Sequence, residues 1–335
     1  MKMSIREFPP SWFASVMGTG VVAVVSYAYS RYIPVLSVLG IVLAYLNILL
    51  FFTLLIPWCI RWIKYREDAL HDLYHPVVSH FYGTIAIAML VLAVDFIVII
   101  GNTVAAWIFW ICGTIATILF SIIIPYLMFV QEKIGIENIT PAWYIPPVGL
   151  IVVPMAGALL LKNTTGLLSD LMLFVNYSAW GSGFFLYVAL YAICMYRYIT
   201  HQLPSCKIAP TVWINLGPIG AGVSSLYMLV KNTFFITYKE PLYVFGLIFW
   251  GFGVWWLVMA IIITFHYVKK ISLPYSLAWW AFIFPFGAYV SATHNVAIVF
   301  GIEVIDYFGL ALYFMLLGMW IITALKTFIH VVLAK

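Results

Sequence analysis

Long apolar stretches alternate with short polar segments along the whole chain. An α-helix needs about 20 apolar residues to cross a bilayer core, and each stretch is about that long or longer. The pattern therefore predicts an all-α integral membrane protein with ten transmembrane helices. Their approximate ranges are 11–29, 33–60, 76–100, 103–130, 142–161, 168–196, 210–231, 241–267, 275–300 and 305–332.

The odd-numbered spans open on similar short motifs, and these motifs recur at a regular interval. The landmark residues Trp12, Pro76, Ala142, Thr211 and Ala278 are separated by 64, 66, 69 and 67 residues. Such a period is longer than those of the common solenoid repeats. It predicts five related helix hairpins, each made of one odd-numbered and one even-numbered span.

Glycine and proline are concentrated within the odd-numbered spans. Proline removes a backbone donor, and lipid penalises the carbonyl that it frees, so an interrupted helix is tolerated only against protein or a water-filled cavity. We therefore expect a quasi-fivefold arrangement in which odd helices line a central pore and even helices lie outside. Close packing by small residues is the alternative explanation. The candidate kinks are Gly18, Gly20, Pro147, Pro154, Pro218 and Pro285.

The composition agrees with a single transmembrane domain over residues 1–335. Hydrophobic residues make up 65% of the chain and charged residues 8%, with a mean hydropathy of +1.09. This leaves too little charged surface for a soluble globular protein, so the expected partner is the lipid bilayer. The net charge of +5 could suggest nucleic acid, but no basic run exceeds Lys269-Lys270. We expect no nucleic-acid partner.

The basic residues are distributed unequally between the two sides of the predicted bundle. Twelve of the 16 Lys and Arg residues fall on the side of the N-terminus, and the other four are Arg31, Lys162, Lys231 and Lys239. Cytoplasmic loops carry the excess of Lys and Arg. The sequence therefore predicts a multi-pass protein of the cell membrane with both termini in the cytoplasm.

The predicted path contains no Lys or Arg in mid-membrane, so anion selection would depend on weaker dipoles. Every odd helix directs its positive N-terminal end at the cytoplasm. Weak binding of this kind suits rapid release and high flux. For each hydroxyl, the alternative is a bond to a carbonyl of its own helix. The side chains that could add polar groups to the path are Thr19, Ser79, Thr84, Asn215, Ser224 and Ser291.

Two histidines in odd-numbered spans could titrate near neutral pH. His80 and His294 could bind an anion when protonated, carry a coupled proton, or form neutral hydrogen bonds with a neighbouring helix. A further alternative is a membrane oxidoreductase in which they are axial haem ligands. Asp95 is either a proton site or a solvated helix end. The four cysteines form no C-x-x-C pair, so we expect neither a metal site nor a cofactor.

Five motifs in order resemble those of the tellurite-resistance/dicarboxylate transporter family, which includes fungal malic acid transporters and plant guard-cell slow anion channels. The resemblance extends over essentially the whole chain. The motifs are FPPSWFASVMGTGVVA at 8–23, HPVVSHFYGTIAIAML at 75–90, TPAWYIPPVGLIVVPMAG at 140–157, APTVWINLGPIGAGVSSL at 209–226 and YSLAWWAFIFPFGAYVSAT at 275–293.

The resemblance implies the same ten helices in five hairpins, a pore lined by the odd helices, and a homotrimer. It also implies a phenylalanine in the ninth helix that occludes the pore. In the stretch AWWAFIFPFG this gate corresponds to Phe284, with Phe282 and Phe286 as alternatives.

The same resemblance bears on the substrate and predicts that the chain is not an enzyme. The motifs at 75–90 and 275–293 are most similar to the malic acid transporter branch, which favours malate or a related C4-dicarboxylate. One position departs from the family pattern, because Ala86 stands where proline is expected. A passive channel for chloride or nitrate is the alternative function. A receptor or assembly factor with a vestigial pore is another.

Overall fold

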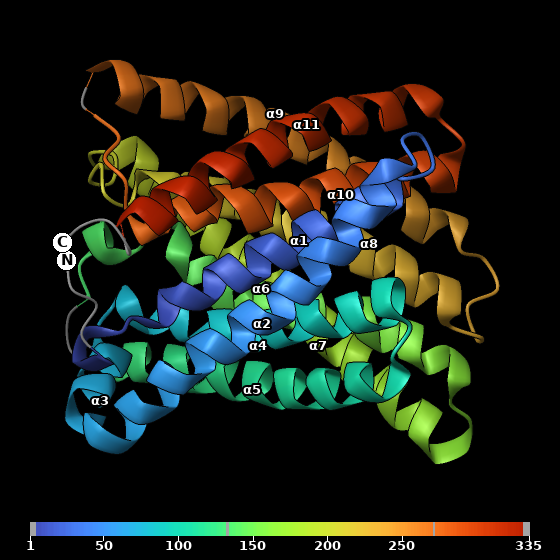
Figure 1. Ribbon diagram of the computed structural model, residues 1–335, viewed down its shortest axis with the longest axis horizontal. Helices are drawn as coiled ribbons and strands as arrows, with labels where there is room; N and C mark the ends of the chain where they lie inside the picture. The colour runs from blue at the N-terminus through green and yellow to red at the C-terminus, as the bar shows by residue number, and fades with distance from the viewer. Residues whose placement is uncertain (1–4, 132–133, 271, 331–335) are drawn as a thin grey trace.

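The computed structural model describes residues 5–131, 134–270 and 272–330 (Figure 1). Lys2, Lys133 and Lys335, which entered the charge comparison, and the last two residues of the tenth predicted span lie outside these ranges. Within them, ten helices are long and apolar enough to cross a membrane, which confirms the predicted number. They are Pro10–Tyr29, Val35–Lys64, Val78–Ile100, Thr103–Phe129, Pro141–Asn163, Gly166–Thr200, Ala209–Asn232, Glu240–Lys270, Leu277–Phe300 and Glu303–Phe328.

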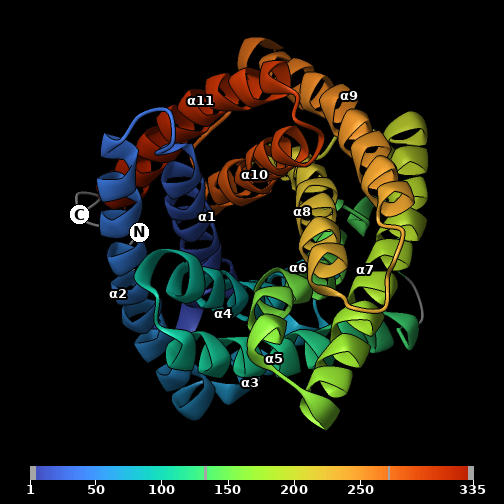
Figure 2. The same cartoon turned by 90° about the vertical axis from the view of Figure 1, so that its right-hand side faces the viewer.

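The odd-numbered spans form the inside of the bundle and the even-numbered spans its outside, as predicted. Between 72% and 94% of the most apolar window of each odd span is buried, against 22% to 33% for each even span. Figure 2 shows the inner helices enclosed by the outer ones. The inner helices are α1 (Phe13–Tyr29), α4 (Gly83–Asp95), α6 (Ile145–Leu160), α8 (Leu216–Asn232) and α10 (Ile283–Phe300).

The helices meet in the order that five sequential hairpins would produce. Each inner helix contacts the outer helix that follows it in the chain, and the inner helices form a closed ring in which α1 contacts both α4 and α10. The quasi-fivefold arrangement of these hairpins stays a prediction. The outer helices, which surround the inner ones in Figure 2, are α2 (Val35–Lys64), α5 (Thr103–Phe129), α7 (Gly166–Thr200), α9 (Glu240–Lys270) and α11 (Glu303–Phe328).

Each of the five repeated motifs folds into a 3-10 segment that leads directly into an inner α-helix. Proline stands in the first turn of several of these segments, where its missing N–H is not needed and its fixed φ suits a helix start. The repeat seen in the sequence is thus a repeated way of beginning an inner helix. The segments are Pro10–Trp12, Val78–Tyr82, Pro141–Tyr144, Ala209–Asn215 and Leu277–Phe282.

The prolines that were predicted to kink the inner spans do not interrupt the inner α-helices. Pro147, Pro218 and Pro285 are each the third residue of an α-helix, where no i−4 carbonyl lies within that helix. They therefore mark the change from 3-10 to α geometry without interrupting an α-helix. Pro154 lies inside α6, and the helix continues past it to Leu160.

The two glycines predicted to kink the first span lie within continuous α1. They allow close packing, which was the alternative explanation. A Cβ at Gly18 would lie 3.0 Å from a ring carbon of Trp280, and one at Gly20 would lie 2.4 Å from a methyl group of Val91. The absence of a side chain therefore sets how closely α1 approaches its neighbours.

One helix was not predicted. The nine-residue helix α3 (Arg66–Tyr74) connects α2 to the third span and contains charged residues that no hydropathy criterion would select. Glu67 and Asp68 lie in its first turn, where negative charge complements the helix dipole. The Tyr82 hydroxyl donates to the carbonyl of Ala69 at 2.7 Å, so α3 is attached to the start of the third span.

Candidate functional site

A small cavity lies where the N-terminal ends of the five inner spans converge. Each span contributes to its wall, for example through Met17, Thr84, Val148, Gly217 and Phe284. The cavity offers about 40 Å³ to the centres of water-sized molecules, which is room for about two or three waters. Because all five inner spans border it, this cavity lies on the axis of the bundle.

Of the three phenylalanines around Pro285, only Phe284 lines this cavity. Phe282 and Phe286 instead pack against Trp213, with ring centroids 5.6 and 5.4 Å away. Helical pitch explains the difference, because residues two apart lie on nearly opposite faces of a helix. The structure thus distinguishes three aromatic residues that the sequence left as alternatives.

The wall of the cavity is almost entirely apolar. Its lining residues include neither Lys nor Arg, and the hydroxyls among them belong to Ser11 and Thr84. The Thr84 hydroxyl lies 2.8 Å from the carbonyl of Pro10 and 2.7 Å from that of Phe81, and it can donate to either. Its proton is therefore directed at the backbone. An anion here would be stabilised chiefly by the converging positive ends of the five helices.

Phe81 is an aromatic residue of the cavity wall that the sequence interpretation missed. It stands in the motif HFYGT between the predicted residues His80 and Thr84, so its position within a repeated motif was the available signal. Phe81 and Phe284 come from different inner spans. Together they add much of the bulk that keeps the cavity small.

A polar strip continues along α10 beyond Phe284 towards the C-terminal ends of the inner helices. Ala288, Ser291 and Asn295 follow Phe284 at intervals of four, three and four residues, which places them on one helix face. Ser291 and Asn295 are only partly buried. The Asn295 amide donates to the Ser224 hydroxyl on α8 at 3.1 Å. Two predicted residues, Ser224 and Ser291, are thereby associated with this strip, and Asn295 was missed.

Other predicted lining residues lie elsewhere in the bundle. The Thr19 hydroxyl accepts a hydrogen bond from the indole N–H of Trp320 on the outer helix α11, at 3.2 Å. A tryptophan N–H in an apolar layer needs such an acceptor, so Thr19 is directed outward. Asn215 is fully buried beside Tyr187 of the outer helix α7, and it does not line the cavity.

Ser79 and His80 are buried in the 3-10 segment before α4 and do not line the cavity either. The Ser79 hydroxyl lies 3.3 Å from Nδ1 of His80. The His80 ring stacks on Trp143, with a centroid distance of 4.4 Å. This ring contact joins the third span to the fifth.

His294 forms a buried pair with an acid of the neighbouring outer helix. Its Nδ1 lies 2.8 Å from a carboxylate oxygen of Asp306 in the first turn of α11. The Tyr32 hydroxyl donates to the other oxygen at 2.8 Å, and this bond raises the pKa of Tyr32. The guanidinium of Arg31 lies 3.7 Å from Asp306. The cluster joins the loop between α1 and α2 to α10 and α11.

The haem alternative does not fit this geometry. All inner spans run in the same direction, and His80 is the third residue of its span whereas His294 is the eighteenth of its own. At 1.5 Å per residue the two histidines are separated by about 20 Å along the bundle axis. One haem iron cannot bind both of them.

Asp95 is a completely buried side chain, which excludes the solvated helix end that the sequence suggested. One of its oxygens accepts a hydrogen bond from the Asn47 amide on α2 at 2.9 Å. A Cβ at Gly20 would lie 2.5 Å from the Asn47 nitrogen and 2.9 Å from Asp95. The glycine therefore leaves space for a polar contact between α2 and α4, away from the central cavity.

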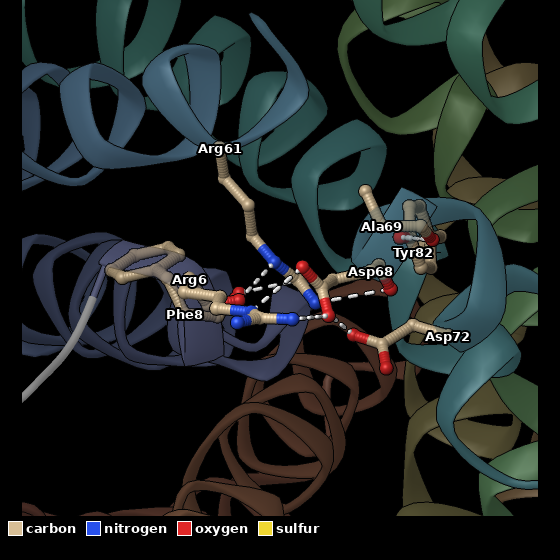
Figure 3. Close-up of polar contacts among 7 residues, drawn as sticks. All are labelled: Arg6, Phe8, Arg61, Asp68, Ala69, Asp72 and Tyr82. Carbon is tan, nitrogen blue, oxygen red and sulfur yellow. Dashed lines mark hydrogen bonds and ion pairs between the residues drawn. The ribbon is translucent and has the colours of Figure 1, made fainter. Parts of the chain in front are cut away.

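A buried arginine organises the end of the bundle where α2 meets α3 (Figure 3). Arg61 donates to the carbonyls of Arg6 and Phe8 at 2.9 and 3.0 Å, and to the Asp72 carboxylate at 2.6 Å. Its side chain is 3% exposed. These hydrogen bonds from the guanidinium on α2 hold the segment before α1 and the helix α3 against α2.

Comparisons with known proteins agree with this architecture. The model of the SLAC1 family, described as voltage-dependent anion channel, matches residues 7–328. An uncharacterized transporter of Methanocaldococcus jannaschii is 53% identical over 98% of this chain and 96% of its own length. A sulfite efflux pump of Arthroderma otae is 28% identical over 95% and 89%. The malic acid transport protein of Schizosaccharomyces pombe is 21% identical over 96% and 78%.

Proposed function

Because this chain belongs to the SLAC1 family of voltage-dependent anion channels, we propose that it conducts small anions along the axis of its five inner helices, past Phe284. The family resemblance seen in the sequence is confirmed. The family consists of transporters and channels, so the chain is an anion transporter and not an enzyme. The observation that carries the finer proposal is the axial cavity bordered by all five inner spans and by Phe284.

Selection in this path depends on dipoles and on the absence of strong charge. The five inner helices present their positive ends to the cavity, and its lining residues include neither Lys nor Arg. An anion is therefore attracted without being held tightly, a condition for conduction. Ser224, Ser291 and Asn295 would receive the anion on the far side of Phe284.

Small inorganic anions are the first candidate substrates. The axial cavity is small and bordered by aromatic side chains, among them Phe284, so a compact anion such as sulfite or chloride meets less steric restriction there than a four-carbon dianion. The similarity to a sulfite efflux pump supports this choice. Malate is the second candidate, favoured by the sequence motifs and by the similarity to a malic acid transport protein.

The test is anion flux into liposomes containing the purified protein, with chloride, sulfite and malate compared in the presence and absence of a pH gradient. The variant Phe284→Ala removes the ring from the cavity wall. We expect its flux to rise about tenfold or more, equivalent to about 1.4 kcal/mol of barrier. Flux that follows the pH gradient would indicate proton coupling, and flux indifferent to it would indicate a passive channel.

A matched control comes from the same helix. Phe282→Ala removes an equal ring that packs on Trp213 outside the cavity, so it should lower stability without raising flux per folded molecule. Equal flux for the wild type and a monodisperse Phe284→Ala variant would contradict the gate. Undetectable flux of all three anions in both proteins would contradict the pore and support a receptor or assembly role.

A further inference from the structure

A second buried arginine, Arg197, lies in the last turn of the outer helix α7. Arg197 is only 5% exposed. Nε and Nη1 of its guanidinium have no hydrogen-bond partner among the described residues. Burying a charge without compensation is costly, and buried polar groups in native proteins nearly always find a partner. These two buried donors therefore need an acceptor that the described residues do not supply.

Arg61 shows how a buried arginine at the equivalent position is satisfied. Arg61 and Arg197 both lie in the last turn of an outer helix, in the first and third hairpins. Arg61 donates to the carbonyls of Arg6 and Phe8 and to the Asp72 carboxylate (Figure 3). Since the hairpins are related, the repeat supplies an internal reference in which protein groups occupy the guanidinium.

The residue that follows Arg197 in α7 also has an unpartnered polar group. The buried hydroxyl oxygen of Tyr198 has no hydrogen-bond partner among the described residues. A tyrosine hydroxyl can donate to an anion, as a guanidinium does.

A surface pocket of about 440 Å³ reaches Arg197 at this end of the bundle. His201, Gln202 and Ser205 line it and add neutral or titratable polar groups. Glu137 also lines it, but this exposed carboxylate lies over Gly135 of its own loop. The ion pairs of the described residues do not join Glu137 to Arg197.

We propose that Arg197, with polar groups of this pocket such as Gln202 and Ser205, binds a small oxyanion at a site separate from the central pore. None of the residues that line this pocket lines the axial cavity. The planar guanidinium fork matches two oxygens of one carboxylate, sulfite or phosphate group, and it favours these over a spherical halide. The charge of this anion compensates that of Arg197.

Thermal unfolding of the detergent-purified protein tests this site without depending on transport. The probes are sodium sulfite, malate and phosphate, each replacing sodium chloride at constant ionic strength and pH. An anion that binds only the folded state raises its Tm in a saturable way. We expect at least one oxyanion to raise the wild-type Tm by about 2 °C or more above its value in chloride.

The variant Arg197→Met should abolish this rise, and its Tm in chloride should equal or exceed that of the wild type because an uncompensated buried charge has been removed. Arg66→Met removes an exposed arginine at the same end of the bundle and should retain the rise. Phe284→Ala should also retain it, which separates this site from the pore. Arg197→Lys keeps the charge but loses the fork, so it should weaken oxyanion binding specifically.

Three results would overturn the proposal. One is a wild-type Tm that none of the three oxyanions raises above its value in chloride. Another is an equal rise in Arg197→Met and in the wild type. The third concerns Glu137: if the rise is absent in the wild type but present in Glu137→Gln, this carboxylate already occupies the guanidinium.

Discussion

At the scale of single residues, buried acids join inner helices to outer ones. Asp95 on α4 meets Asn47 on α2, and Asp306 on α11 meets His294 on α10. Asp306 also accepts from Tyr32, so three segments converge on one carboxylate. A buried acid with several partners stabilises one arrangement of helices, because removing it leaves donors unsatisfied.

Asp306→Ala should lower the free energy of unfolding by about 1–3 kcal/mol, because His294 and Tyr32 lose their acceptor in a buried site. The measurement is the shift in thermal unfolding followed by tryptophan fluorescence. Glu303→Ala is the control, since Glu303 is an exposed acid in the same first turn of α11. Its removal should cost less than about 1 kcal/mol. Equal shifts for both variants would contradict a structural role of the Asp306 cluster.

At the scale of helices, glycine determines how closely the inner spans approach each other. A Cβ at Gly220 on α8 would lie 2.3 Å from the backbone nitrogen of Tyr289 and 2.4 Å from the carbonyl carbon of Ala288 on α10. Backbone atoms inside a helix cannot move aside as a flexible side chain can. This contact therefore sets the separation of α8 and α10 next to the polar strip that follows Phe284 on α10.

Gly220→Ala should destabilise the protein by about 1–3 kcal/mol or more, because the methyl group forces α8 and α10 apart. Gly251→Ala is the matched control. Gly251 is exposed on the outer helix α9, and a Cβ there would meet nothing within 4 Å. Since alanine favours a helix by about 1 kcal/mol over glycine, this control should match or exceed wild-type stability. Similar loss in both variants would mean that helix packing is not the cause.

At the scale of the whole molecule, the arrangement of charges orients the bundle in the membrane. The even-numbered helices expose mostly apolar side chains, consistent with contact with lipid. With ten spans the chain returns to the side on which it began, and the excess of Lys and Arg predicts that this side is cytoplasmic. Cytoplasmic termini, the plasma membrane and the homotrimer remain predictions.

Labelling of single cysteines in a cysteine-free background tests the orientation. Thr237→Cys, in the exposed segment before α9, should react with a membrane-impermeant maleimide in intact cells. Gln202→Cys, in the exposed segment after α7, should react only after permeabilisation. The reverse pattern would invert the topology, and with it the side of the membrane on which Arg197 and the axial cavity open.

The sequence by itself determined the number of spans and which of them lie inside. Ten apolar stretches follow from the length needed to cross lipid, and five repeated motifs rich in Gly and Pro mark the inner spans, whose small residues allow close packing against neighbouring helices. These properties are local and can be read along the chain. The position of the cavity, between the starts of the inner helices, follows from the same motifs once they fold as 3-10 segments.

Only the tertiary structure decided which side chains face one another. Helical pitch separates Phe284 from Phe282 and Phe286, but the packing of the seventh span against the ninth decides that Trp213 meets the latter two and that Phe284 meets the cavity. Arg61 and Arg197 lie in the last turns of related helices. Carbonyls of distant residues accept from Arg61, whereas Nε and Nη1 of Arg197 have no partner in the described part of the chain. Pairing of this kind depends on contacts between residues far apart in the chain. A pattern of hydrophobic and polar positions cannot specify such contacts. It indicates which face of a helix is buried, but it does not indicate which helix packs against that face.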